Sequence, residues 1–183
     1  MPTAEKIKEI KRSFRPLMNG VTASSMREKG AAYRINWGVS MADLQCLASE
    51  YGKDKALAEA LWVENVRECK ILATLIMPPE QMSPTLTKQW LAEMPTLEMA
   101  EWAAFHLFQY VEGIAPIALC AIRSAHVNER ICGFHILSRL FLKGYTIDKA
   151  SEKAFLTAAK TSANEGEMGE RHAAANCLTR YER

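Results

Sequence analysis

Apolar residues at helical spacing run along almost the whole chain with few residues between successive segments, and this pattern most constrains the fold. The first segment, residues 3–18, places Ile7, Ile10, Phe14 and Leu17 on one face. Alternating apolar and polar residues, which mark a half-buried strand, are hard to find, and valine is scarce. Only seven prolines and nine glycines interrupt 183 residues, so the connections are short. The sequence therefore predicts an all-α fold.

Capping residues and helix breakers predict where each helix begins and ends. Ser40, with Asp43 three residues later, and Asp54 are suitable N-caps, and Pro78-Pro79 is a stop signal. Ser83 followed by Pro84 is a further start signal. Helices are expected at residues 3–18, 40–51, 54–63, 66–77, 96–111, 129–142, 147–163 and 168–182, with others beginning at Pro84 and Pro116. Residues 21–39 are expected to be irregular.

Short stretches of the sequence resemble one another at intervals typical of helical repeats. Asn65-Val-Arg67-Glu-Cys69 aligns with Asn128-Glu-Arg130-Ile-Cys132, and Gly169-Glu-Arg171-His-Ala173 is a weaker third copy. With a further helix starting near Leu97, midway between the first two, the period is about 32 residues. Such spacing predicts a HEAT/ARM-like helical-repeat solenoid, a right-handed superhelix of antiparallel helix pairs. We expect one domain, residues 1–183, in which residues 1–40 form a basic N-terminal arm and residues 41–183 the stacked pairs.

The arginine of each copy falls in the first turn of its helix, where a cation opposes the helix dipole. The asparagine of the first two copies is predicted to be the N-cap. One interpretation is that the arginine and the helix N-terminus together hold an anion. The alternative is that the arginine pairs with a carboxylate of the neighbouring repeat, or with Glu129 or Glu170. Both interpretations are open at the level of sequence.

The charge of the chain is small but uneven. The formal net charge is +2, yet residues 1–40 carry eight lysines and arginines against three acids. A basic arm suits an acidic partner such as a phosphate backbone, and a solvated helix face is the alternative. There is no apolar run of membrane-spanning length, and the charged N-terminus does not resemble a secretory signal. Five widely spaced cysteines without a CxxC motif are expected to be buried core residues of a cytoplasmic protein.

Residues 37–91 carry a resemblance to a known family. Gly38-Val39, Leu61-Trp62, Glu68, Pro78-Pro79 and Trp90 follow one another in an order and at a spacing that resembles the AlkD-type DNA alkylation repair family. The resemblance implies a HEAT-like solenoid that holds duplex DNA on a basic concave face. It also implies excision of N3- or N7-alkylated purines without base flipping, with a carboxylate that stabilises the developing sugar cation.

The sequence departs from that family at the positions that carry the chemistry. Leu97 and Glu98 stand where the resemblance implies a Trp-Asp pair, and Glu101 stands where it implies the catalytic aspartate. The arginine of the next repeat falls on Ile131, with Arg130 one residue earlier. Glu101 and Glu98 are therefore the candidate catalytic residues. Because the family's residues are replaced at these positions, we expect the excision of alkylated purines to be weakened or lost. The alternative is that both carboxylates only complement the helix dipole.

The remaining candidate residues concern DNA contacts and the core. The residues expected to contact DNA are Arg34, Trp37, Arg67, Lys70, Arg130 and Arg171. Trp62, Trp90 and Trp102 lie on predicted helices and are expected in the core. The four histidines, His106, His126, His135 and His172, lack metal-ligand spacing, so neither a metal nor another cofactor is expected.

The function predicted from these features is that of a DNA-binding protein of the 3-methyladenine/7-methylguanine DNA glycosylase-like family, with duplex DNA as its partner and no membrane association. Two alternatives remain. One is an active glycosylase in which Glu101 replaces the aspartate, and the other is a HEAT-repeat scaffold with a protein partner, because a fold by itself does not fix a function.

Overall fold

The computed structural model describes residues 2–183, and the prediction of an all-α chain is confirmed. Within that range the chain forms eleven α-helices and three short 3-10 helices. It contains no β-strand there, only an isolated parallel bridge between Ile35 and Val66. The chain folds into two compact units, one that ends at Gln81 and one that begins at Met82.

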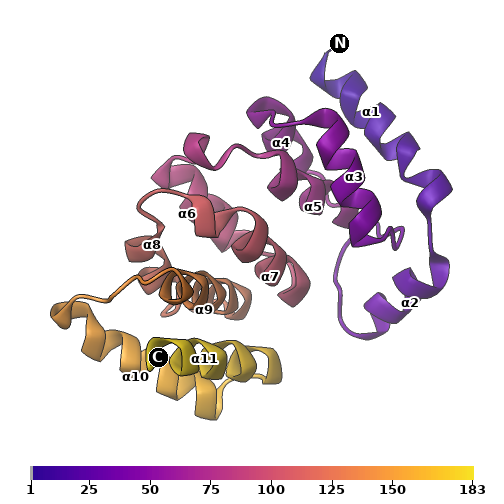
Figure 1. Ribbon diagram of the computed structural model, residues 1–183. Coiled ribbons are helices and arrows are strands. Elements are labelled where there is room, and N and C mark those ends of the chain that lie inside the picture. Colours follow the sequence, from indigo (N-terminus) through magenta and orange to yellow (C-terminus); the bar gives the residue numbers. More distant parts are fainter. Residues whose placement is uncertain (1) are drawn as a thin grey trace. The chain divides into compact units, whose positions relative to one another are not determined.

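The first unit contains five α-helices and two 3-10 turns (Figure 1). These are α1 (Thr3–Ser13), η1 (Arg15–Leu17), α2 (Gly20–Glu28), α3 (Met41–Tyr51), α4 (Lys55–Trp62), α5 (Arg67–Ile76) and η2 (Pro79–Gln81). Helix α5 packs against α3 and α4, and α1 packs against α4. The core between them is formed by fully buried Leu44, Leu57, Leu61, Trp62 and Leu72.

Two helix predictions for this unit need correction. Residues 21–39 are not irregular throughout, because α2 occupies Gly20–Glu28. Its N-cap is Asn19, whose side chain accepts a hydrogen bond from the Thr22 N–H, a cap that the low apolar content of α2 concealed. The predicted N-cap Asn65 is also wrong, since α5 begins at Arg67 after Val66 and Asn65 Oδ1 instead accepts from the Arg34 N–H.

The segment between α2 and α3 is held to α5 by a buried carboxylate. Glu68 Oε1 accepts hydrogen bonds from the N–H groups of Trp37 (3.2 Å) and Val39 (3.3 Å). Gly38 between them has a φ of +70°, and a Cβ at this position would lie 2.9 Å from the Ala23 nitrogen. A side chain is therefore excluded here both by backbone conformation and by space. The Gly38-Val39 turn thus fixes the close approach of this segment to α2.

The second unit contains six α-helices and one 3-10 turn. These are α6 (Pro84–Ala92), α7 (Leu97–His106), η3 (Phe108–Tyr110), α8 (Ile114–Ala121), α9 (Val127–Leu142), α10 (Lys149–Glu165) and α11 (Met168–Tyr181). Helix α9 is central, because α7, α8 and α11 all pack against it (Figure 1). Its Gly133 permits close contact with the C-terminal end of α8, since a Cβ there would lie 2.9 Å from Cγ2 of the C-cap residue Ile122 and 3.1 Å from the Ala118 carbonyl oxygen.

Side-chain caps account for half of the ten helix starts that the sequence predicted, the fifth being Asp148 at the start of α10. Ser40, Asp54, Ser83 and Thr96 each accept a hydrogen bond from a backbone N–H in the first turn of their helix. The predicted cap Asn128 is wrong. Helix α9 begins at Val127, one residue earlier, and the Asn128 amide donates to the Met94 carbonyl oxygen at 3.2 Å.

The cysteines and the N-terminal lysines differ in part from expectation. Cys69, Cys132 and Cys177 are buried as predicted, whereas Cys46 and Cys120 are exposed. In α1, Lys6 pairs with Asp54 (3.1 Å) and Lys11 pairs with Glu64 (2.7 Å), so part of the basic arm is neutralised within the first unit. No helix within residues 2–183 combines the length and apolar character that crossing a bilayer requires.

Candidate functional site

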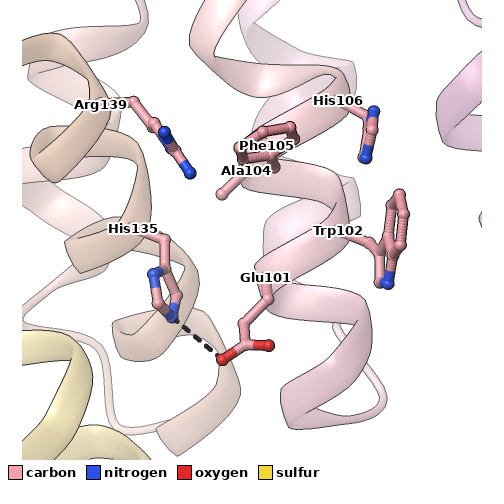
Figure 2. A pocket seen from close by; sticks show the side chains of 7 residues that line it. All are labelled: Glu101, Trp102, Ala104, Phe105, His106, His135 and Arg139. Atoms are coloured by element: carbon pink, nitrogen blue, oxygen red, sulfur yellow. Dashed lines mark ion pairs between the residues drawn. The ribbon is translucent and has the colours of Figure 1, made fainter. Parts of the chain in front are cut away.

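A pocket of about 390 Å³ opens between α7 and α9 of the second unit. It is lined by Glu101, Trp102, Ala104, Phe105 and His106 from α7 and by His135 and Arg139 from α9. Figure 2 shows Glu101 and His135 directed toward each other, with Arg139 and Phe105 one turn further along their helices. The pocket therefore combines a carboxylate, aromatic rings and a guanidinium group.

The Glu101 carboxylate is the acidic group of this pocket. Its pKa is raised above the ordinary value, first by burial and then by the negative charge of Glu98, while His172 acts in the opposite direction. The Glu101 side chain nevertheless keeps 52% of its surface exposed, so a ligand can reach it. Because it is partly desolvated, this carboxylate interacts more strongly with a cation that forms beside it than a fully hydrated carboxylate would.

His135 is a polar neighbour of Glu101 in the pocket. Its Nε2 atom lies 3.7 Å from Glu101 Oε1, which is beyond hydrogen-bonding distance. Burial, followed by the charges of Arg139, His172 and Arg180, lowers the pKa of His135 to about 4. The imidazole is therefore neutral at pH 7, and the contact drawn in Figure 2 becomes an ion pair only when His135 is protonated. Within residues 2–183, Nε2 is shielded from solvent without a hydrogen-bond partner.

Aromatic rings form the α7 side of the pocket. Trp102 stacks on His106, with ring centroids 4.1 Å apart and an interplanar angle of 11°. Phe105 meets the same imidazole edge-on at 4.8 Å. The prediction that Trp102 is a core residue is therefore wrong, because it is only half-buried and lines the pocket. The prediction is confirmed for Trp62 and Trp90, which are fully buried.

The comparison with protein families decides which family this is. A family model described as "DNA alkylation repair enzyme" matches residues 10–115, more than half of the chain. The chain belongs to this DNA alkylation repair family. Glu101, Trp102, Phe105 and His106 of this family member lie within the matched residues, whereas His135 and Arg139 lie beyond them.

The comparison with solved structures agrees with the all-helical fold. One solved structure, described as a new family related to the HEAT-like repeat DNA glycosylases with affinity for branched DNA structures, matches with a TM-score of 0.80. The match covers 94% of this chain and 74% of that chain at 17% identity, so it shows that this alkylation-repair family member has the HEAT-like fold. No curated protein matches the chain.

In the first unit, two of the four residues predicted to contact DNA, Arg67 and Lys70, are engaged by protein partners. The Arg67 side chain is buried and donates to the Val39 carbonyl oxygen (3.0 Å) and to Glu68 Oε1 (3.3 Å). Lys70 donates to the Trp62 carbonyl oxygen (2.6 Å) and lies over the Trp62 ring at 4.6 Å. Neither the buried guanidinium nor this ammonium group is directed at a surface ligand.

Arg34 and Trp37 of the first unit lie closer to solvent. Arg34 is exposed, and Trp37 is half-buried with its ring 5.3 Å from that of Phe14. The Ile35–Val66 bridge brings their segment beside the start of α5, so Arg34, Trp37 and Arg67 are neighbours in this unit.

In the second unit, Arg130 pairs with a carboxylate of the neighbouring repeat. Its Nε and Nη2 atoms lie 2.7 Å and 2.8 Å from the two oxygens of Glu170 on α11, and Nη1 donates to the Ser124 and Ala125 carbonyl oxygens. For Arg130 the structure therefore agrees with the carboxylate interpretation and not with joint anion binding. Arg171, beside Glu170, is exposed. Glu98 lies one turn before Glu101 on α7 and is half-buried.

Sequence reasoning identified Glu101 but missed the α9 residues opposite it. Glu101 and His135 are 34 positions apart, as are Phe105 and Arg139. That separation is close to the predicted repeat period, so equivalent positions of successive repeats could have been paired in the sequence. Among residues 2–183, no group of three or more His, Cys, Asp or Glu side chains could hold a metal ion.

Proposed function

We propose that this protein binds duplex DNA that is branched or otherwise distorted, and that the pocket around Glu101 faces the DNA. The observation that carries the proposal is the pocket itself. It combines aromatic rings and the Arg139 guanidinium with Glu101, which stands where the resemblance implies the catalytic aspartate. Membership of the DNA alkylation repair family supports a DNA ligand. The structurally similar protein with affinity for branched DNA structures supports the preference for distorted DNA.

The proposal includes a weakened excision of alkylated purines. A cationic alkylpurine is already a good leaving group, so the protein mainly has to place a negative charge near the sugar. Glu101 is one methylene longer than an aspartate, and a displacement of this kind costs about 100-fold in rate. The raised pKa of Glu101 also reduces the charged fraction as the pH falls. Leu97 offers no aromatic face at the position where the resemblance implies a tryptophan.

Further DNA contacts are proposed at the exposed residues of the predicted set. Arg34 and Arg171 are exposed and carry full charges that suit phosphate groups, and Trp37 offers part of an indole ring. We also propose that residues 1–183 act as one repeat domain in which residues 1–40 add positive charge. The cytoplasmic location expected from the sequence stays a prediction.

The binding proposal is tested by fluorescence anisotropy with a labelled four-way junction and a linear duplex of equal length. We expect binding of both probes at low salt, tighter binding of the junction, and affinities that fall as salt rises because counterions are released from phosphates. Absence of binding to either probe at low salt would contradict the proposal and favour the protein-interaction scaffold. Equal affinity for both probes would contradict the preference for branched DNA.

The excision proposal is tested by release of 7-methylguanine from methylated duplex DNA. We expect slow release by the wild-type protein, and loss of that release in Glu101→Gln, which keeps the shape of the side chain but removes its charge. Glu112→Gln, at an exposed carboxylate of the second unit that does not line the pocket, is the matched control and should retain the rate. Undetectable release by the wild-type protein over long incubation would rule out residual excision without affecting the binding proposal.

A further inference from the structure

Three packed helices of the second unit present rows of side chains spaced four residues apart. Helix α9 carries His135 and Arg139, followed by Lys143 at its C-cap, and α11 carries His172, Asn176 and Arg180. On α7, Glu101 is followed one turn later by Phe105. Residues four apart lie on one face of a helix, so each row marks one face. The charges of Arg180 and His172 act on α9, and that of His172 acts on Glu101, so these faces adjoin.

The exposed Phe and Tyr rings lie at the C-terminal end of these rows, near Arg139 and Lys143. Among the Phe, Tyr and Trp side chains of residues 2–183, Phe105 and Tyr110 are the only two that are mainly exposed rather than buried or half-buried, at 42% and 58%. Both lie in the second unit, Phe105 near the end of α7 and Tyr110 at the end of η3. Large exposed aromatic side chains are costly to keep in water and are common at binding surfaces.

A cationic side chain lies over each of these two rings. The Arg139 guanidinium carbon lies 4.1 Å from the centroid of Phe105, and Lys143 Nζ lies 4.4 Å from the centroid of Tyr110. Both rings remain partly exposed beside their cations.

The cations at this end have no acidic partner. Burial lowers the pKa of Arg139, and the positive charge of Arg180 lowers it further, so the two guanidinium groups repel each other. Within the described part of the chain, neither Arg139, Lys143 nor Arg180 forms an ion pair with an acidic side chain. Lys143 Nζ donates to the Gln109 carbonyl oxygen (3.0 Å) but, unlike the half-buried Lys70, its side chain is exposed. A cluster of cations without acidic partners beside exposed rings is complementary to a ligand with negative charge and flat apolar faces.

We propose that Phe105, Tyr110, Arg139, Lys143 and Arg180, here called the aromatic–cation patch, bind unpaired nucleotides of branched DNA. The phosphates contact the cations, and the bases stack on the two rings or on the guanidinium plane of Arg139. The inference rests on the proposed DNA-binding function and names the feature of branched DNA that this surface recognises.

Unpaired nucleotides fit the patch better than an intact duplex does. In a duplex each base is covered by its neighbours above and below, so its face is not available to a protein ring. Unpaired bases at a branch expose their faces, and stacking on aromatic side chains tolerates any base sequence. The patch adjoins the pocket, since Phe105 and Arg139 belong to both, which places an unpaired nucleotide next to Glu101.

The test uses the full chain and three labelled probes. These are a linear duplex, the same duplex with an unpaired single-stranded arm, and a third in which every nucleotide of the arm is abasic. The abasic arm keeps the phosphates but has no bases to stack. We expect the wild-type protein to bind the arm with bases most tightly. The double variant Phe105→Ala with Tyr110→Ala should lose about tenfold of that affinity, with less than a twofold change for the duplex and the abasic arm.

Matched variants separate stacking from charge and from folding. Arg139→Ala should weaken binding to both arms, because phosphate contacts are lost with or without bases. Lys149→Ala, an exposed cation on α10, should change no affinity. Phe105→Leu with Tyr110→Leu keeps apolar bulk without an aromatic face and should reproduce the selective loss if the alanine variant unfolds.

The outcomes separate this inference from the proposed function. Failure of the wild-type protein to bind any probe would overturn both. Binding of the wild-type protein without preference for the arm with bases would overturn the patch alone. Equal losses for all three probes in the double variant, or no loss for any, would also overturn the patch while the DNA-binding proposal stands.

Discussion

At the scale of single residues, burial is the main cause of the pKa shifts in the pocket. His135 and Glu101 face each other, and both are shifted toward their neutral forms, His135 by a lowered pKa and Glu101 by a raised one. For each group, desolvation of the charged form is the largest cause. The two side chains are therefore not held together by a strong ion pair at neutral pH. This leaves the Glu101 carboxylate available for a cation from a ligand.

The pKa of His135 predicts a loss of stability in mild acid. Because His135 titrates near 4 in the folded protein and near the ordinary value of about 6.5 when unfolded, the unfolded chain takes up a proton first as the pH falls. The stability conferred by the neutral imidazole is complete above about pH 6.5 and is lost progressively down to about pH 4, by up to about 3 kcal/mol. Urea denaturation at a series of pH values measures this loss.

The control for this prediction is His135→Gln, which has no titrating ring. Arg139 on the same helix, His172 and Arg180 from α11 and Glu101 from α7 remain in the variant, so their contributions cancel in the difference between the two proteins. We expect the wild-type protein to lose more stability than the variant between pH 6.5 and pH 4. Parallel pH profiles would show that His135 is protonated in the folded state, contrary to the prediction.

At the scale of elements, successive repeats are joined by buried polar pairs as well as by apolar contact. Glu170 on α11 is only 2% exposed, and both of its oxygens accept from Arg130 on α9. The Arg130 side chain also satisfies the Ser124 and Ala125 carbonyl oxygens just before α9. One arginine therefore connects two repeats and the preceding turn. In the first unit, Glu68 connects α5 to the segment around Gly38 in a similar way.

Removal of Arg130 should be strongly destabilising because it leaves the buried Glu170 carboxylate without its cationic partner and with only neutral donors such as the Ser162 hydroxyl. We expect Arg130→Met to lower the free energy of unfolding by about 3 to 5 kcal/mol, as observed when one partner of a buried pair is removed. The double variant Arg130→Met with Glu170→Leu should recover a large part of this loss. Arg171→Met, an exposed neighbour, should change the free energy by less than about 0.5 kcal/mol. Urea denaturation of the four proteins at neutral pH measures these differences, and a double variant as unstable as Arg130→Met would contradict the explanation.

Helix positions were largely predictable because their signals are local. Ser40, Asp54 and Ser83 cap helices at the predicted places, since the cap and the N–H group that it satisfies are three residues apart. The two wrong N-cap predictions also arise because only local signals were used. Asn65 and Asn128 have the right chemistry for a cap, but each makes a hydrogen bond to a residue more than 30 positions away, with Arg34 and Met94. No local signal distinguishes such an asparagine from a cap.

At the scale of the whole molecule, net charge says little about where an acidic ligand binds. The chain is only +2, and part of its basic N-terminal region pairs with acids of the first unit. The unpaired cations of the second unit come from α9 and α11, which the overall composition does not mark as basic. The distribution of partners among the charged groups therefore matters more than their number.

The sequence by itself determined that this protein is all-helical, that several of its helices begin at particular caps, and that its residues match the DNA alkylation repair family. Those properties follow from apolar spacing and capping, which act over a few residues. Only the tertiary structure decided which charged side chains are available to a ligand. Arg67 and Arg130 look like anion-binding residues in the sequence, yet buried pairing with Glu68 and Glu170 occupies them. Glu101 shares its pocket with His135 because packing of α7 on α9 brings residues 34 positions apart to 3.7 Å, and no local interaction encodes that distance.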